Sequence, residues 1–276
     1  RSTLFPYTTL FRSLAERALD ILRQYSVGLG TGGTALAKPK VAGRAKSKEL
    51  IEAVYADNRH SLTEEEGKKI FDAYGIPAPG EANAASADEA EKLSQTVGFP
   101  CVMKIVSPDI QHKTDVGGVV VGVKDAKQAR EAYERIMASC RAKKPGARLD
   151  AVSIQQMVSG QEVILSMVRD PQFGPVVSFG LGGIYVEILR EISQRHVPMT
   201  EEQLDDMIQS TKAFKLLSGA RGMAASDLDA MKDVIRRVVL IAEENPEINE
   251  IEINPVLVGR RGEGCYAVDC LCNLKH

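Results

Sequence analysis

Hydrophobic and polar residues follow two regular patterns in most of this chain, one typical of helices and the other of strands. From residue 61 onward, apolar residues recur three and four positions apart, several times behind a Ser or Thr cap, which predicts helices at 64–74, 87–97, 126–140, 200–217 and 226–244. Short apolar runs predict strands at 101–106, 118–123, 151–158, 162–168, 174–183, 248–258 and 264–272. Helices between short strands, with a terminal strand pair, indicate an α+β fold rather than a doubly wound sheet.

The beginning of the chain lacks this regularity. Residues 1–13 do not start with methionine and resemble a translated sequencing adapter, so we expect them to be an artefact. Residues 14–25 have helical spacing, and the glycine-rich stretch 26–46 indicates a flexible linker. We therefore expect a helix and linker over 14–57 and a folded domain over 58–272.

Composition and charge exclude several classes of protein. Of the 276 residues, 44% are hydrophobic and 26% charged, which is typical of a globular protein. Lys and Arg number 35 against 37 Asp and Glu, so there is no basic surplus for nucleic-acid binding. No apolar run approaches the ~20 residues that a membrane span needs. Five cysteines without a secretory signal favour reduced thiols in a cytoplasmic protein.

The strand predicted at 248–258 carries candidate metal ligands. Glu250, Glu252 and Asn254 share one face of this strand, because strand side chains alternate, and the isoleucines between them face the core. Asp269, in the apolar run predicted as the partner strand, is costly to bury unless it is paired or bound to a metal. These oxygen atoms suit Mg²⁺. An ordinary exposed strand face would explain the alternating acids equally well.

Candidate phosphate-binding groups precede these acids in the chain. Lys104 lies inside the strand "CVMKIV", where a buried ammonium group needs a partner such as a phosphate. The polar turn at 107–118 would place backbone N–H groups around further phosphate oxygens. His112, on this turn, can accept a phosphoryl group as a neutral imidazole, although most loop histidines are only solvated. Lys104 and the acids together predict convergence on one Mg-nucleotide.

Four stretches of the sequence match one known family in its own order: "GIPAP", "GFPCVMKIVSPDIQHKTDVGGVVVGV", "QQMVSGQEVILSMVRDPQFGPVVSFGLGGIYVEIL" and "EIEINPVLV…AVDC". Residues 58–272 resemble the ATP-grasp domain of ADP-forming (NDP-forming) acyl-CoA synthetases, typified by acetate–CoA ligase. They are more distantly similar to the β subunit of succinyl-CoA synthetase. The resemblance implies an ATP-grasp fold, in which two α+β lobes clamp a nucleotide. The smaller lobe would be about 79–157, and the larger about 58–78 plus 158–272.

The resemblance also implies roles for individual residues. His112 would carry phosphate transiently, Glu252 would lie beside the phosphoryl acceptor, and Arg195 would be a further catalytic residue. Asn254 and Asp269 would bind Mg²⁺. The positions that would contact ATP or ADP are Lys104, Lys113, Thr114, Gly117, Gly118, Gln156, Met157, Val158, Glu162, Gly182, Gly183 and Glu187. Among them, Gln156 to Val158 would form a hinge strand against the adenine, and Glu162 would hold the ribose. Gly182, Gly183 and Glu187 would belong to a second glycine loop that closes over the phosphates.

The implied reaction interconverts acyl-CoA, ADP and phosphate with a carboxylic acid, CoA and ATP. CoA-binding and ligase domains would lie upstream in the natural chain or in a separate α subunit, so that this chain would be the C-terminal ATP-grasp portion. Two alternatives remain open. One is an ATP-grasp ligase with another acceptor, which would not need His112. The other is a non-catalytic nucleotide-sensing domain of an acetyltransferase-like protein.

Overall fold

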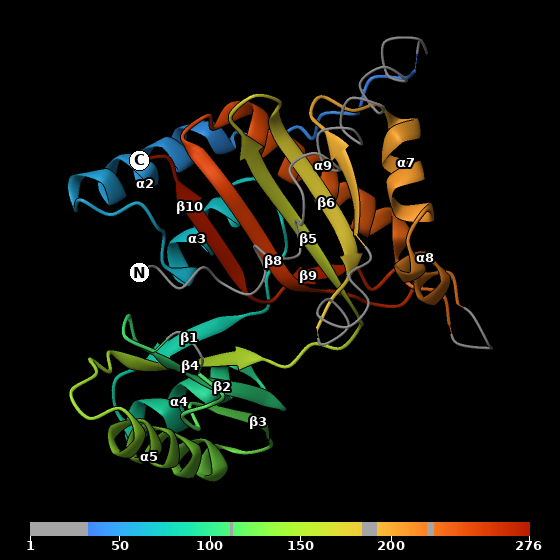
Figure 1. The fold of residues 1–276 in the computed structure, drawn as a ribbon. Coiled ribbons are helices and arrows are strands. Elements are labelled where there is room, and N and C mark those ends of the chain that lie inside the picture. The colour runs from blue at the N-terminus through green and yellow to red at the C-terminus, as the bar shows by residue number, and fades with distance from the viewer. Residues whose placement is uncertain (1–32, 111–112, 184–191, 220–223) are drawn as a thin grey trace. The chain divides into compact units, whose positions relative to one another are not determined.

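The structure is a computed structural model, which describes residues 33–110, 113–183, 192–219 and 224–276. The chain divides into two compact units (Figure 1). The small unit is Pro79–Val158, and the large unit consists of the chain up to Ala78 and from Ser159 onward. The helix predicted at 14–25 lies outside the described residues.

The small unit is an antiparallel sheet covered by helices. Its four strands lie in the order β1 (Glu81–Ala84), β4 (Ala151–Gln156), β2 (Cys101–Val106), β3 (Val119–Val123). Helices α4 (Ala87–Val97) and α5 (Ala126–Lys143) share one hydrophobic core with it. Met103 and Ile105 of β2 are buried in this core, so strand alternation turns Lys104 between them to the opposite face.

The large unit contains a six-stranded antiparallel sheet. Five strands lie in the order β10 (Cys270–Leu274), β8 (Ile248–Val258), β5 (Gln161–Asp170), β6 (Gly174–Leu181), β7 (Ile192–His196), and β9 (Cys265–Ala267) pairs with β8. The helices of this unit are α2 (Gly43–Ala56), α3 (Glu64–Ala73), α7 (Glu201–Gln209), α8 (Lys212–Leu217) and α9 (Leu228–Glu244). None of the helices in the described part of the chain combines the length and the apolarity of a membrane span.

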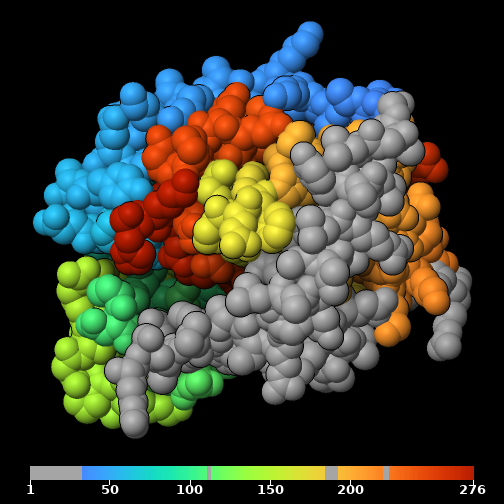
Figure 2. Space-filling view, turned by 45° about the horizontal axis from the view of Figure 1, so that its top comes forward, coloured from blue at the N-terminus to red at the C-terminus, as the bar shows by residue number. Residues whose placement is uncertain are grey.

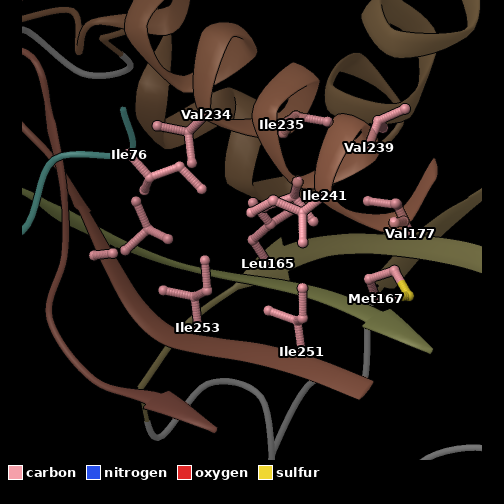
Figure 3. Packing of buried hydrophobic residues seen from close by; sticks show 14 of the residues in the cluster. Ile76, Leu165, Met167, Val177, Val234, Ile235, Val239, Ile241, Ile251 and Ile253 are labelled. Atoms are coloured by element: carbon pink, nitrogen blue, oxygen red, sulfur yellow. The ribbon is translucent and has the colours of Figure 1, made fainter. Parts of the chain in front are cut away.

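The core of the large unit lies between its sheet and α9 (Figure 3). Ile251 and Ile253 of β8 and Leu165 of β5 point toward this helix. Both isoleucines are fully buried, and the residues that alternate with them, Glu250, Glu252 and Asn254, are partly exposed on the other face. This confirms the two-faced strand that the sequence pattern predicted.

The structure corrects the prediction of a flexible linker over 26–46, because α2 begins at Gly43. This helix and residues 33–42 form a brace on the large unit, which we call the N-terminal brace (residues 33–56; Figure 2, blue). Arg44 donates hydrogen bonds to Asn245 at 2.9 Å and to Glu247 at 2.9 Å. Such contacts lie some two hundred residues away along the chain, which is why local composition did not reveal them.

Three further predictions were wrong in detail. The helix predicted at 200–217 is divided, because Thr211 leaves helical geometry and caps α8 through a bond from Phe214 N–H. Helix α9 begins after Asp227 rather than after Ser226. Asp269 lies in a bend between β9 and β10 and not inside a strand. Strands β1 and β7 were not predicted, since neither has a sustained apolar alternation.

Candidate functional site

In the large unit, five of the predicted site residues lie together at one end of the sheet. Gly183 N–H donates to Asn254 Oδ1 at 3.3 Å, and Gly182 N–H donates to the main-chain oxygen of Glu162 at 3.2 Å. Asn254 N–H donates to the main-chain oxygen of Asp269 at 3.3 Å. The structure therefore brings the start of the second glycine loop, the predicted ribose ligand and both predicted metal ligands into one cluster.

Glycine is required at both positions of this loop. A Cβ atom on Gly182 would lie 2.8 Å from the main chain of Val163, which would force the strand to shift. Gly183 has a positive φ of 61°, and a Cβ atom there would overlap the Glu162 carboxylate. The two glycines thus allow the loop to approach β5 and the Glu162 side chain closely.

Glu252 is the partly buried carboxylate on the same face of β8. Burial, together with the nearby charge of Glu250, raises the pKa of Glu252, while a hydrogen bond with the Asn254 side chain opposes this effect. A cation bound nearby would lower the pKa again, because it favours the ionised form. The electrostatics of this face therefore suit a bound cation.

Asn254 and Asp269 also fit a particular kind of metal site. Among the described residues, no three His, Cys, Asp or Glu side chains are grouped closely enough to hold a metal ion by themselves. One amide oxygen and one carboxylate are too few for a structural metal cage. Mg²⁺, however, is commonly held by one or two carboxylates and completed by substrate phosphates and water. The donor set fits Mg²⁺ that is bound together with a nucleotide.

In the small unit, Lys104 lies on the sheet face opposite the helices, next to Ser153 of β4. The same face holds a polar group that the sequence reasoning missed. Glu81 accepts a hydrogen bond from Ser153 Oγ at 2.5 Å and another from Gln155 Nε2 at 3.2 Å. The alternation of Ser153 and Gln155 with apolar residues in "AVSIQQ" was the signal that could have revealed this polar face.

The turn after β2 uses its glycines differently from the prediction. Gly118 N–H donates to the main-chain oxygen of Lys113 at 2.7 Å, and Gly117 N–H donates to that of Thr114 at 3.0 Å. These N–H groups are already bonded inside the turn, so the expected phosphate cradle does not include them. Gly117 instead has a φ of 70°, and a Cβ atom there would lie 2.5 Å from Ser139 Oγ of α5. Both glycines serve turn geometry and close packing.

The segment predicted to face the adenine follows β4. Gln156 N–H donates to Gly80 O at 2.8 Å, and Met157 N–H donates to Pro100 O at 3.1 Å. Met157 is 43% exposed, although its side chain is apolar and polarisable. Val158 ends the small unit. An exposed methionine in the segment after β4 suits contact with the flat aromatic ring of a base, because its sulfur atom is polarisable.

The structure places Arg195 away from the other predicted catalytic residue that it describes, Glu252. In the sheet, Arg195 pairs with the buried core residue Val177, so its side chain lies on the helix-covered face, opposite to Glu252. It binds Asp206 of α7 and Ser193 Oγ, and only 10% of the side chain is exposed. Arg195 therefore fastens α7 to β7. His112 and Glu187 lie outside the described residues.

Comparison with known proteins places this arrangement in a family. A profile of the ATP-grasp domain matches residues 53–274. The chain belongs to the ATP-grasp family. The β subunit of ADP-forming acetate–CoA ligase I from Pyrococcus furiosus is 49% identical to this ATP-grasp chain over 213 residues, which are 77% of the chain and 91% of the subunit. The ADP-forming 4-hydroxybutyrate–CoA ligase of Nitrosopumilus maritimus is 37% identical over 265 residues, 96% of the chain but 38% of that ligase.

Solved structures show the same ATP-grasp fold. The dinucleotide-forming acetyl-coenzyme A synthetase 1 of Ca. Korarchaeum cryptofilum, in complex with coenzyme A, Ca-AMPCP and HgCl⁺, matches with a TM-score of 0.78 and 40% identity. Its complex with coenzyme A and Mg-AMPPCP matches with a TM-score of 0.73 and 38% identity. Each match covers 83% of this chain and 100% of the solved one. The family and fold that the sequence motifs implied are confirmed.

Proposed function

We propose that this chain is the nucleotide-binding part of an ADP-forming acyl-CoA synthetase, in which it transfers a phosphoryl group between a phosphohistidine and ADP. The names of the similar acetate–CoA and 4-hydroxybutyrate–CoA ligases support this proposal. The whole reaction converts acyl-CoA, ADP and phosphate into a carboxylic acid, CoA and ATP. CoA-binding and ligase domains perform the acyl chemistry, either fused to this chain, as the partial coverage of the longer ligase suggests, or in a separate α subunit.

The observation that carries the proposal is the cluster of oxygen atoms in the large unit. Asn254 Oδ1 and the Asp269 carboxylate hold Mg²⁺, and Glu162 binds the ribose hydroxyl groups beside Gly183. Mg²⁺, when bound with the nucleotide, offsets the negative charge of the phosphates during transfer.

The proposal also gives nucleotide-contacting roles to groups of the small unit and of the glycine-containing loops. Lys104 contacts a phosphate oxygen, and the segment Gln156–Val158 lies against the adenine. Lys113 and Thr114 on the turn after β2, and Glu187 of the second glycine loop, contribute further polar groups. Their residue types support these roles, because an ammonium group, a hydroxyl group and main-chain amides are common ligands of nucleotide phosphates and bases.

His112 is the proposed phosphoryl acceptor. The chain is incubated with Mg-ATP labelled on the γ-phosphate, and we expect a protein-bound phosphate that is labile in acid and stable in base. His112→Ala should abolish the label, whereas His60→Ala, a control histidine that contacts Lys275 O in the large unit, should keep it. An unlabelled wild type that still binds Mg-ATP would contradict phosphoryl transfer and leave a nucleotide-sensing domain or a ligase with another acceptor.

We also propose that the protein is located in the cytoplasm. The five cysteines are all free thiols in the structure, and most of them are buried. Free thiols of this kind are typical of proteins in a reducing compartment. Fractionation of the natural host should recover the protein with the cytoplasmic enzymes, and recovery with the membranes would contradict this part of the proposal.

A further inference from the structure

A row of polar side chains continues from Glu252 across the large-unit sheet. In the strand register, Glu252 of β8 lies opposite Ser166 of β5, Ser166 lies opposite Ser178 of β6, and Ser178 lies opposite Gln194 of β7. Directly opposite residues point to the same face of a sheet. These four side chains therefore form one continuous row on one face of the sheet. Helix α9 lies on the other face, where it covers the apolar residues that alternate with the row (Figure 3).

The two serines in this row are unusual because they are almost completely buried. Ser166 is 7% exposed and Ser178 is 3% exposed. Gln194 Nε2 donates a hydrogen bond to Ser178 Oγ at 3.0 Å. Within the described part of the chain, the Ser166 hydroxyl group makes no hydrogen bond, and a buried hydroxyl group without a partner destabilises the folded state. The Ser166 hydroxyl group is therefore available to donate and to accept a hydrogen bond within this row.

The donors and acceptors give the row a direction. Ser178 Oγ already accepts from Gln194, so the one hydroxyl proton of Ser178 is left to donate. Its neighbour in the row is Ser166. When Ser166 Oγ accepts this proton, the hydroxyl proton of Ser166 is in turn left to donate. An ionised carboxylate only accepts hydrogen bonds, so Glu252 is the natural end of such a chain.

We propose that Gln194, Ser178 and Ser166 form a hydrogen-bond relay that positions the Glu252 carboxylate. The inference rests on the proposed function, in which Glu252 lies beside the phosphoryl acceptor. Adjacent strands are ~4.8 Å apart, so rotation of the two serine side chains about χ1 is enough to bring neighbouring oxygens into hydrogen-bond distance. The Asn254 side chain, on the same strand, forms a hydrogen bond with the Glu252 carboxylate, and Ser166, on the neighbouring strand, donates a second one in the relay. Two donors on one carboxylate fix its orientation.

Ser166→Ala and Ser178→Ala, each measured in the γ-phosphate labelling assay, test the relay. At saturating Mg-ATP, both variants should lower the labelling rate about tenfold or more, while the dissociation constant for Mg-ATP stays within about twofold. Ser166→Thr, which keeps the hydroxyl group, should restore most of the rate. Ser94→Ala is the matched control, because Ser94 is a fully buried serine bonded to Glu91 O in α4 of the small unit.

A wild-type labelling rate in Ser166→Ala overturns the relay, and so does an equal loss in Ser94→Ala. A loss that Ser166→Thr does not restore also overturns it. If the wild type binds Mg-ATP but is not labelled, the proposed function fails, and the relay is judged by a crystal structure with Mg²⁺ and a non-hydrolysable ATP analogue. In that structure, Ser166 Oγ should lie within about 3.2 Å of both Ser178 Oγ and a carboxylate oxygen of Glu252. Serine hydroxyl groups that are turned away from this row would contradict the relay.

Discussion

Replacing Asn245 with alanine should release the N-terminal brace from the large unit. Asn245 is completely buried just after the end of α9. Its Oδ1 accepts hydrogen bonds from Arg44 at 2.9 Å and from Ser47 Oγ at 2.6 Å. Its Nδ2 donates to Tyr74 Oη at 2.9 Å and to Ile241 O at 2.8 Å. One side chain thus joins the brace, the end of α3 and the last turn of α9.

The expected loss of stability follows from these four bonds. A buried hydrogen bond contributes about 1 kcal/mol net, so their simple sum is about 4 kcal/mol. Three partners keep a second bond, since Arg44 still pairs with Glu247, Ser47 still donates to Arg44 O, and Tyr74 still donates to a glutamate. We therefore expect a loss of about 2–3 kcal/mol in the free energy of opening of this region.

Amide hydrogen exchange read by mass spectrometry measures this opening locally. Peptides that span 43–56 should exchange about 30- to 150-fold faster in Asn245→Ala, which corresponds to 2–3 kcal/mol. Peptides from α5 in the small unit should not change. Lys48→Ala is the matched control in the brace, because its ion pair with Glu52 is exposed and should contribute less than about 1 kcal/mol. Unchanged exchange at 43–56 in Asn245→Ala would refute the view that this network holds the brace.

Three other changes test further parts of the account. Gly183→Ala should weaken Mg-ATP binding about tenfold or more by calorimetry, because the new Cβ displaces the Glu162 carboxylate, whereas Gly262→Ala, also at positive φ but in open space, should not. Arg195→Met should lower the free energy of unfolding in urea by about 1–3 kcal/mol and leave the affinity for Mg-ATP unchanged. A loss of affinity without a loss of stability would instead support a catalytic role for Arg195. The hydrogen bond from Arg59 lowers the pKa of Glu66 from 4.5 to about 2, despite burial, so stability from this pair is present above pH 4.5 and is lost as the pH falls toward 2. Arg59→Met should therefore show a smaller decrease in its urea midpoint with acid than the wild type, and an equal decrease would contradict this pairing.

Local patterns were sufficient to predict most elements of this fold. The capping boxes at Thr63 and Thr200 both form, because they depend on residues only three positions apart. The alternation in 248–258 correctly separated the core face of β8 from the face that carries Glu252. The family motifs predicted the ATP-grasp fold. They are spread over the same residues that the ATP-grasp profile matches.

The errors lie where long-range contacts decide the structure. The N-terminal brace has the composition of a linker, and its order comes from partners such as Asn245 near the other end of the chain. Arg195 follows the second glycine loop in the sequence, but the sheet face on which it lies depends on the register between β6 and β7. The pairing of Ser166 with Ser178 could not be predicted, because one sequence does not show which residues are cross-strand neighbours.

Titration calorimetry of Mg-ATP against the wild type and three single variants, Lys104→Met, Asn254→Ala and Asp269→Asn, tests the central claim most directly. We predict that the wild type binds Mg-ATP, that each variant binds about tenfold or more weakly, and that removal of Mg²⁺ weakens the wild type far more than it weakens Asp269→Asn. Arg195→Met, the matched control, should bind as the wild type does. Equal affinity for Mg-ATP in all of these proteins would contradict the proposed nucleotide-binding roles of Lys104, Asn254 and Asp269.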